Sequence, residues 1–142
     1  MSFKFSEKSK KRMEGVNPIL VEVMLKAIEV SPIDFGIPRD GGLRTTERQQ
    51  ELYALGRTVH ARKVTNADGI RNKSYHQSGN AIDVYAYVAK KASWKKVHMG
   101  IIAGVIIATG RLMGVEIEWG GTFGSKTFQG WDSAHFQLKK NR

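Results

Sequence analysis

The sequence predicts a small α+β domain in which an antiparallel central sheet packs on helices. Residues 18–30 and 94–113 carry apolar side chains at helical spacing, whereas residues 115–119 and 135–138 alternate between apolar and polar side chains, as half-buried strands do. The 142 residues match the size of one ordinary domain and can bury a core. No repeat, low-complexity segment or linker divides them, so we expect residues 1–142 to form a single domain.

The first part of the chain is predicted to be mainly helical. Ser6 can cap a short polar helix over residues 7–13. Asn17 precedes a proline, and a cap followed by proline at the first helical position starts a helix over residues 18–30. A further proline stops this helix, and residues 34–38 are expected to form a short strand.

A third helix is expected over residues 47–55. Thr46 and Gln49 fit a capping box, in which each side chain accepts a hydrogen bond from a backbone N–H of the first turn. Arg44 therefore lies at the junction between an extended segment and a helix. The polar and basic residues 56–73 are predicted to form a long loop, and such loops often border binding sites.

The second half of the chain begins with a predicted strand over residues 81–88. Ser93 then caps a long helix over residues 94–113, which we expect to be buried beneath the sheet. The apolar stripe of this helix is predicted to comprise Val97, Ile101, Val105, Ala108 and Leu112, widened by Ile102, Ile106 and Ile107. His98 is expected to be a structural residue of the helix, and His60 a surface residue of the preceding loop.

The predicted strand over residues 115–119 has apolar side chains on one face and acidic side chains on the other. Ile117 and Trp119 are expected on one face, and Glu116 and Glu118 on the other. We expect the glutamates to form a solvated face, with a regulatory cation site between them as the alternative. Trp119 could either line a cleft or pack in the core.

The formal net charge is +10, and basic residues gather at both ends of the chain. Such a field attracts polyanions, including nucleic acid, anionic lipid surfaces and the carboxylate-rich bacterial cell wall. A nucleic-acid domain is expected to carry an aromatic-bearing motif or a recognition helix, and neither is found. A solvated basic surface without a partner is the remaining alternative. The basic residues at the ends are Lys8, Lys10, Lys11, Arg12, Lys139, Lys140 and Arg142.

The sequence contains no cysteine, which excludes disulfides, thiolate zinc sites and cysteine nucleophiles. The basic N-terminus is not followed by an apolar segment and cleavage site, so no secretory signal is visible. The most apolar run, residues 99–108, is too short to span a bilayer. We therefore expect a protein that is made soluble in a cytoplasm.

Two histidines and two aspartates could supply the side chains of a catalytic zinc site. Hydrolytic Zn²⁺ takes three N or O ligands from protein and keeps a fourth position for water, whose pKa it lowers. His76, Asp83 and His135 would be the ligands, and Asp132 the free carboxylate that takes the proton from water. For the bare spacing, the alternative is that the histidines are unrelated and the aspartates are turn residues.

The local sequence supports the zinc site. Gly79 and Asn80 allow a tight turn, after which the chain can bring Asp83 back beside the first histidine. Along residues 135–138, alternation puts His135 and Gln137 on one face and their apolar neighbours on the other.

The residues around these ligands resemble a known family. The chain contains Ser-x-His-x-x-Gly-x-Ala-x-Asp at residues 74–83, Trp-Gly-Gly at residues 119–121 and Asp-x-x-His-Phe at residues 132–136. This combination resembles the metallopeptidase family of the bacterial D-alanyl-D-alanine carboxypeptidases, the vancomycin-resistance dipeptidases and the phage L-alanyl-D-glutamate endopeptidases. The resemblance implies a catalytic core over residues 38–138.

The same resemblance implies one zinc ion per chain and a role for each site residue. Arg44, in a Gly-x-Arg-Thr context, would hold a substrate carboxylate or stabilise the oxyanion. Gln49, Ser74 and Trp119 would make further substrate contacts. Asp132 would act as the base and then pass the proton to the departing amine.

An aspartate three positions before the last histidine resembles the phage branch of the family. With the compact size and the missing signal, it favours a phage endolysin that cuts the L-alanyl-D-glutamate bond of peptidoglycan stem peptides and lyses the host. A D-alanyl-D-alanine carboxypeptidase is the alternative within the family. A non-catalytic cell-wall-binding module is the alternative of another class, although a binding module has no use for Asp132 as a free base.

The resemblance also implies a location and a set of partners for the protein. We expect a monomer that stays in the host bacterial cytoplasm until lysis, when it is released to the periplasm and cell wall. Its partners would be stem peptides and the anionic envelope surface, and no specific nucleic acid.

Overall fold

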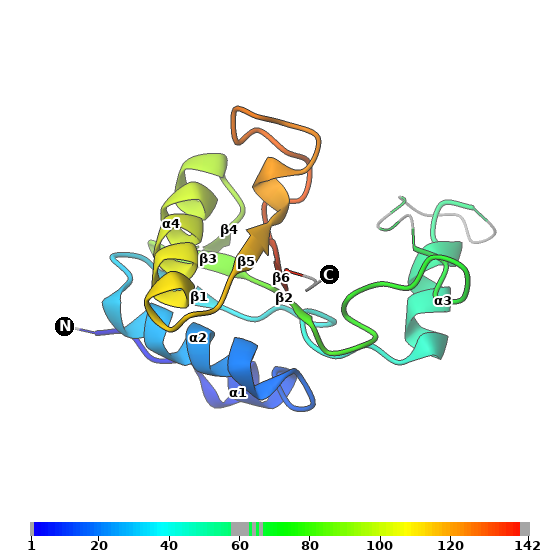
Figure 1. The fold of residues 1–142 in the computed structure, drawn as a ribbon, viewed down its shortest axis with the longest axis horizontal. Coiled ribbons are helices and arrows are strands. Elements are labelled where there is room, and N and C mark those ends of the chain that lie inside the picture. Colours follow the sequence, from blue (N-terminus) through cyan, green and yellow to red (C-terminus); the bar gives the residue numbers. More distant parts are fainter. Residues whose placement is uncertain (1, 58–62, 64, 66, 140–142) are drawn as a thin grey trace.

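The computed structural model describes residues 2–57, 63, 65 and 67–139, and it confirms the α+β class. His60, Lys140 and Arg142 lie outside these residues. Figure 1 shows the elements, which are, in chain order, α1 (Glu7–Arg12), α2 (Pro18–Val30), β1 (Asp34–Gly36), α3 (Thr46–Ala54), β2 (Ala81–Asp83), β3 (Tyr85–Val88), β4 (Lys91–Ser93), α4 (Lys96–Leu112), β5 (Ile117–Trp119), the 3-10 helix η1 (Gly120–Thr122) and β6 (His135–Leu138).

The described strands form two antiparallel sheets, where the sequence predicted a single central one. One sheet has the order β1-β3-β4 and the other the order β2-β6-β5. The strand predicted over residues 81–88 is divided at Val84, which is fully buried and whose N–H donates to the carbonyl of Ala134 at 2.9 Å. The chain passes from one sheet to the other at this residue, so β2 is free to pair with β6.

Helix α4 packs against α2 and β5 through only part of the predicted stripe, in which Ile102 and Ile106 are buried. Val97, Ile101 and Leu112 of the predicted stripe are exposed, Leu112 to 90%. The buried residues are Met99, Ile102, Ala103, Ile106 and Gly110. Gly110 allows close packing on this side, because a Cβ added there would lie only 2.9 Å from the carbonyl oxygen of Val115 and 3.1 Å from the side chain of Ile117 in β5.

Helix starts were predicted to within a few residues. The side chains of Ser6 and Asn17 cap α1 and α2 as expected. The cap of α3 is Thr45 and not Thr46, since the Thr45 hydroxyl accepts from the N–H of Arg48. The cap of α4 is Lys95, because Ser93 ends β4 and uses its hydroxyl to pair with His98 Nδ1 at 2.7 Å.

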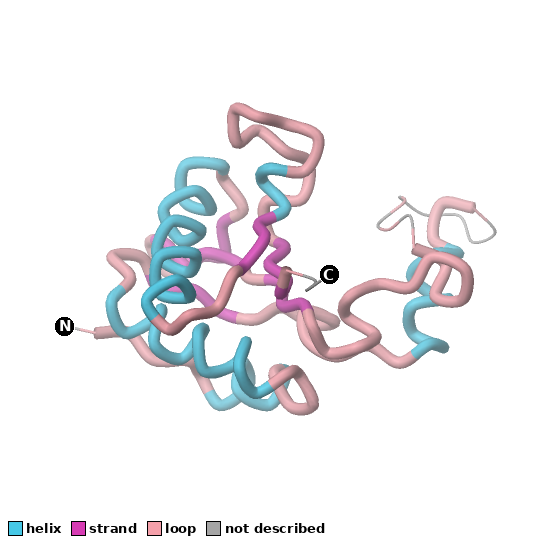
Figure 2. The backbone as a smooth tube through the Cα atoms, in the orientation of Figure 1, coloured by secondary structure: helices cyan, strands magenta, loops and turns pink. Residues whose placement is uncertain are grey.

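The layers place the core between the helices and the sheets. Phe136 of β6 and Ile82 of β2 are fully buried in one core cluster with residues of α2 and α4, and Ile117 and Trp119 of β5 face the same core, as the alternation predicted. Helix α3 lies apart from this body, joined to it by loops that Figure 2 shows in pink. No helix in the described part of the chain is long and apolar enough to cross a membrane.

Candidate active site

The three predicted ligands meet at the edge of the second sheet. Asp83 of β2 and His135 of β6 are direct partners across antiparallel strands, so their side chains share a face. His76 comes from the turn that precedes β2. Asp83 Oδ1 lies 3.2 Å from His76 Nε2 and 3.2 Å from His135 Nδ1. The candidate ligand atoms all lie within 4.8 Å of one another, as one metal ion requires.

The turn that carries His76 is held by backbone contacts. Gly79 has φ +77°, and a Cβ there would lie 2.9 Å from the carbonyl oxygen of Gly15. The N–H of Asn17 donates to the Gly79 carbonyl at 2.8 Å, and the N–H of Arg44 donates to the His76 carbonyl at 3.0 Å. Glycine is thus needed both for the left-handed conformation and for the close packing of this turn on the chain before α2.

The hydrogen bonds of both imidazoles suit metal binding. His76 Nδ1 lies 2.9 Å from the carbonyl oxygen of Gly42, and His135 Nε2 lies 2.7 Å from Oε1 of Gln137. Each of these oxygens can only accept a hydrogen bond, so each ring keeps its N–H there and turns the lone pair of the other nitrogen toward Asp83. Two imidazole nitrogens and one carboxylate fit a zinc ion with an open position.

Electrostatics at the site separate the two aspartates. Burial would raise the pKa of Asp83, but the adjacent His76 and His135 outweigh it and hold this pKa below its ordinary value. Burial lowers the pKa of His135, but the adjacent carboxylate of Asp83 favours the charged ring, reverses the effect and leaves the pKa raised. Asp132 lies 4.0 Å from His135 Nδ1, and burial raises its pKa. A ligand carboxylate thus stays ionised beside a carboxylate that is poised to exchange protons.

Arg44 points into the same site. Its guanidinium donates to the carbonyl of Asp40 at 2.9 Å, to Gln49 Oε1 at 3.1 Å and to Asp83 Oδ2 at 3.3 Å. Gln49 is fully buried behind it, with its Nε2 donating to Thr65 Oγ1 and to the Ala67 carbonyl.

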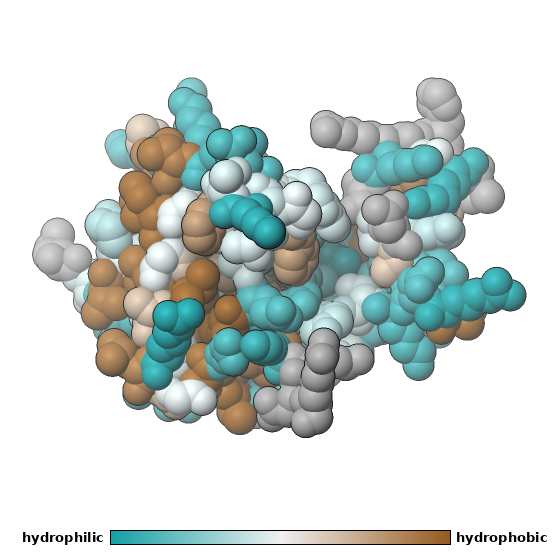
Figure 3. All heavy atoms as spheres, turned by 45° about the horizontal axis from the view of Figure 1, so that its top comes forward, coloured by the Kyte–Doolittle hydropathy of each residue, from teal (hydrophilic) through white to brown (hydrophobic). Residues whose placement is uncertain are grey.

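A cavity of about 520 Å³ opens over these residues. Figure 3 shows a hollow between the main body and the part of the chain that contains α3. The cavity is lined by Arg44, Lys63, Thr65, Ala67, Asn72, Lys73, Ser74, Tyr75, His76, Asp83, Phe123, Trp131, Asp132, His135 and Gln137.

Of the predicted substrate contacts, Arg44 and Ser74 line this cavity, whereas Gln49 and Trp119 lie outside its lining. Trp119 is 6% exposed, is stacked with Phe136 and donates its indole N–H to the Ser133 carbonyl at 2.7 Å. The aromatic wall consists instead of Phe123 and Trp131, whose ring centroids lie 6.0 Å apart. Their loop shows no periodic pattern in the sequence, so only proximity to Asp132 could have indicated a role.

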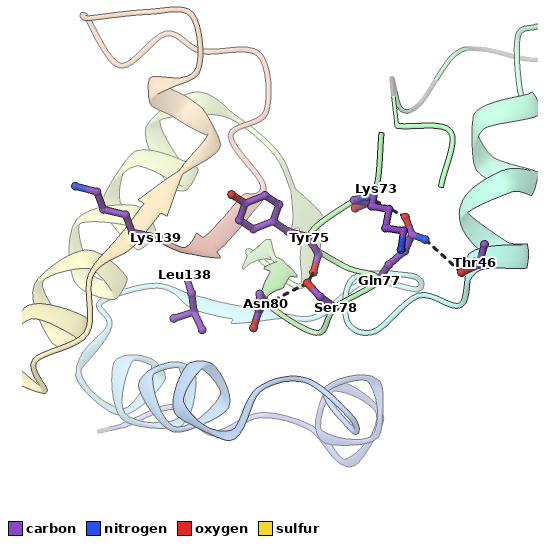
Figure 4. A pocket seen from close by; sticks show the side chains of 9 residues that line it. Thr46, Lys73, Tyr75, Gln77, Ser78, Asn80, Leu138 and Lys139 are labelled. Atoms are coloured by element: carbon purple, nitrogen blue, oxygen red, sulfur yellow. Dashed lines mark hydrogen bonds between the residues drawn. The ribbon is translucent and has the colours of Figure 1, made fainter. Parts of the chain in front are cut away.

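A second cavity of about 720 Å³ adjoins the first and shares Lys73, Ser74 and Tyr75 with it. Figure 4 shows its lining, with Tyr75 between Lys73 and Lys139 in this view. Two amines and several amide and hydroxyl groups therefore border this extension of the cleft, and its lining contains no acidic residue.

Three convergent N and O atoms that could hold a metal ion, a carboxylate beside them and an adjoining cavity are the arrangement of a hydrolytic metal site. A profile of the phage L-alanyl-D-glutamate peptidases matches residues 1–138. The chain belongs to this family.

Two relatives agree with the assignment. The chain is 31% identical over 121 residues to the L-alanyl-D-glutamate peptidase of Escherichia phage T5, a match that spans 84% of this chain and 81% of the phage protein. It also superposes on the crystal structure of the L-Ala D-Glu endopeptidase ChiX of Serratia marcescens with a TM-score of 0.74 and 32% identity. That match covers 97% of this chain and 91% of the other.

Proposed function

We propose that this protein is a zinc-dependent peptidoglycan endopeptidase, a phage endolysin that hydrolyses the L-alanyl-D-glutamate bond of stem peptides and lyses the host cell. The observation that carries the proposal is the convergence of His76, Asp83 and His135 with Asp132 unligated beside them. The names of the relatives, which specify this bond, support the choice of substrate.

His76 Nε2, His135 Nδ1 and one oxygen of Asp83 would hold the zinc ion. When bound, zinc supplies Lewis-acid polarisation of the peptide carbonyl and lowers the pKa of water. The raised pKa of Asp132 suits a carboxylate that accepts the proton of the attacking water and returns it to the departing amine. Asp132 also lines the cavity, so it can reach a substrate bound there.

Arg44 would bind the substrate or stabilise charge on the carbonyl oxygen. Guanidinium has five N–H donors, and three are engaged by Asp40, Gln49 and Asp83 within the described residues. The remaining donors can meet an oxyanion or a carboxylate of the stem peptide. Ser74, which lines the same cavity, is proposed as a further substrate contact.

Charge and shape suit an acidic peptide. The lining of the two adjoining cavities includes Lys63, Lys73 and Lys139, and a stem peptide carries a carboxylate near the proposed bond. We therefore place the continuation of the peptide in the second cavity. The protein would act as a monomer that is retained in the host cytoplasm until lysis gives it access to the cell wall.

Mass analysis of the soluble products from purified peptidoglycan tests the proposal. The wild type should release fragments with a new N-terminal D-glutamate, whereas Asp132→Asn and a chelator-treated sample should release them about 10²- to 10⁴-fold more slowly. Asp34→Asn, a change of the same kind in β1, serves as the matched control and should cut normally. Release of free D-alanine would assign a carboxypeptidase, and a wild type that binds zinc but releases nothing would indicate a binding module.

A further inference from the structure

A chain of hydrogen bonds leads away from the site through side chains that line β6 and β5. His135 Nε2 lies 2.7 Å from Oε1 of Gln137, and Gln137 Nε2 donates to Oε1 of Glu118 at 3.1 Å. Nothing in the mechanism above uses Glu118, which the sequence analysis placed on a solvated face. In the structure it is half-buried and bonded to a neighbour of the site.

The sheet register builds this chain. Glu118 and Gln137 are direct partners across β5 and β6, and His135 is two residues from Gln137 on the same strand, so all three side chains share one face. On the opposite face, Phe136 is fully buried and anchors the strand in the core. The three side chains therefore cannot exchange faces without moving Phe136 into water.

The order of donors and acceptors is fixed by the carboxylate at the end. An ionised glutamate can only accept, so Glu118 attracts the NH₂ group of Gln137 and leaves the amide oxygen facing His135. That oxygen in turn requires a proton on His135 Nε2. The proton is then absent from Nδ1 in the neutral ring, and this is the nitrogen that faces Asp83 and His76.

We propose that Gln137 and Glu118 are positioning residues that fix the ring orientation and the tautomer of His135 as a metal ligand. This inference rests on the metal site of the proposed function. Without Glu118, the Gln137 amide could turn and present its NH₂ group to His135, which would favour a proton on Nδ1 and so oppose metal binding. Without Gln137, the ring loses its only described partner at Nε2.

Zinc affinity, measured by chelator competition without any peptide substrate, is the first readout. Gln137→Leu should bind zinc about 10- to 100-fold more weakly, the range typical of lost partners of metal-bound histidines. Glu118→Ala should weaken binding by a smaller factor. Glu116→Ala is the matched control, because Glu116 lies two residues away and pairs with Lys139 but not with Gln137. It should bind zinc as the wild type does.

The double variant Glu118→Gln with Gln137→Glu exchanges the two side chains. The hydrogen bond between the two positions then reverses, because the carboxylate at position 137 can only accept, but His135 Nε2 keeps an acceptor at position 137. The double variant should recover zinc affinity, and NMR of the zinc-loaded protein should show a protected imidazole N–H at His135 Nε2 in this variant and in the wild type, but not in Gln137→Leu.

Wild-type zinc affinity in folded Gln137→Leu, or a double variant no better than Gln137→Leu, would overturn the inference. A wild type that binds zinc but yields no stem fragments would instead contradict the proposed function alone.

Discussion

The Arg44 side chain is held at three points, and this decides what it can do. Contacts to Asp40, Gln49 and Asp83 fix the plane of the guanidinium, so its remaining donors point in set directions. Burial lowers the pKa of Arg44, and the neighbouring Asp83 opposes that effect. A lysine would keep the charge but could not keep three separate hydrogen bonds in one plane.

Arg44→Lys should therefore lower kcat/KM on a soluble muropeptide by about 10²-fold, the cost typical of one lost oxyanion donor. Arg111→Lys is the matched control, since Arg111 is an exposed residue in the last turn of α4 and does not line the cavity. Steady-state kinetics on both variants check the prediction. Equal rates for Arg44→Lys and Arg111→Lys would show that the fork geometry of Arg44 is not used.

At the residue scale, the sequence predicted which candidate ligands lie together better than it predicted which residues line the cavity. His76, Asp83 and His135 could be chosen because metal chemistry restricts the residue types and because the residues around them resemble a known metallopeptidase family, although His135 lies 52 residues after Asp83. Gln49 and Trp119 have side chains that suit a cleft or a core equally well, and only packing decides. Gln49 is kept out of the cavity because its amide oxygen accepts a hydrogen bond from Arg44. Trp119 is kept out because its ring stacks with Phe136.

At the scale of elements, an ion pair between Arg48 and Asp40 links α3 to the segment that contacts Arg44. Arg48 of α3 donates two hydrogen bonds to the carboxylate of Asp40, at 2.8 and 3.1 Å, and Asp40 has φ +63°, a conformation that aspartate and asparagine adopt more readily than other non-glycine residues. Asp40 also accepts from Arg44 through its carbonyl. The Asp40 segment thus joins the helix to the arginine of the site.

The hydrogen bonds from Arg48 hold the pKa of Asp40 below its ordinary value. A folded pKa below the unfolded value, about 3.9, adds stability above that pH and loses it as the pH falls through the folded value. Asp40→Asn, which tolerates the same backbone, should lower the free energy of unfolding at pH 7 by ~0.5–1 kcal/mol, because the pair is partly exposed. Urea unfolding at neutral pH and near pH 3 checks this.

The difference between wild type and Asp40→Asn should shrink toward zero in acid. A difference that is the same at both pH values would mean that the ion pair is not its source. Glu51→Gln removes the other partner of Arg48, an exposed carboxylate, and should have little effect at either pH.

The two largest errors in the predicted elements have one cause. The α4 sequence is apolar on nearly every side, and residues 81–88 alternate without interruption, so neither pattern contains the information that picks a face or a break. The buried side of α4 contains Gly110, which lies close to the carbonyl oxygen of Val115, and the strand is divided at Val84, whose N–H donates to Ala134. Ala134 is distant from Val84 in the sequence, and no sequence pattern indicates that Val115 contacts Gly110.

At the scale of the whole molecule, part of the positive charge lies on α1, outside the linings of the two cavities. The net charge is +10, and exposed lysines occur on α1 as well as beside the cleft. Within the described part of the chain, the lysines of α1 line neither cavity, so we expect any effect on catalysis to act through the electrostatic field around the molecule. A field of this kind matters for a polyanionic wall and much less for a small substrate.

Replacing Lys8, Lys10 and Lys11 of α1 by glutamine should therefore weaken digestion of intact cell wall, and activity should fail at lower salt than for the wild type. The reason is that exposed charges act over about 10 Å at 0.1 M ionic strength and are screened beyond it. Turbidity loss of cell walls across a salt series measures the first effect. Turnover of a small soluble muropeptide is the control and should stay at the wild-type level, because the site itself is unchanged. An equal loss on both substrates would show that the lysines act on folding or on the site and not by attraction to the wall.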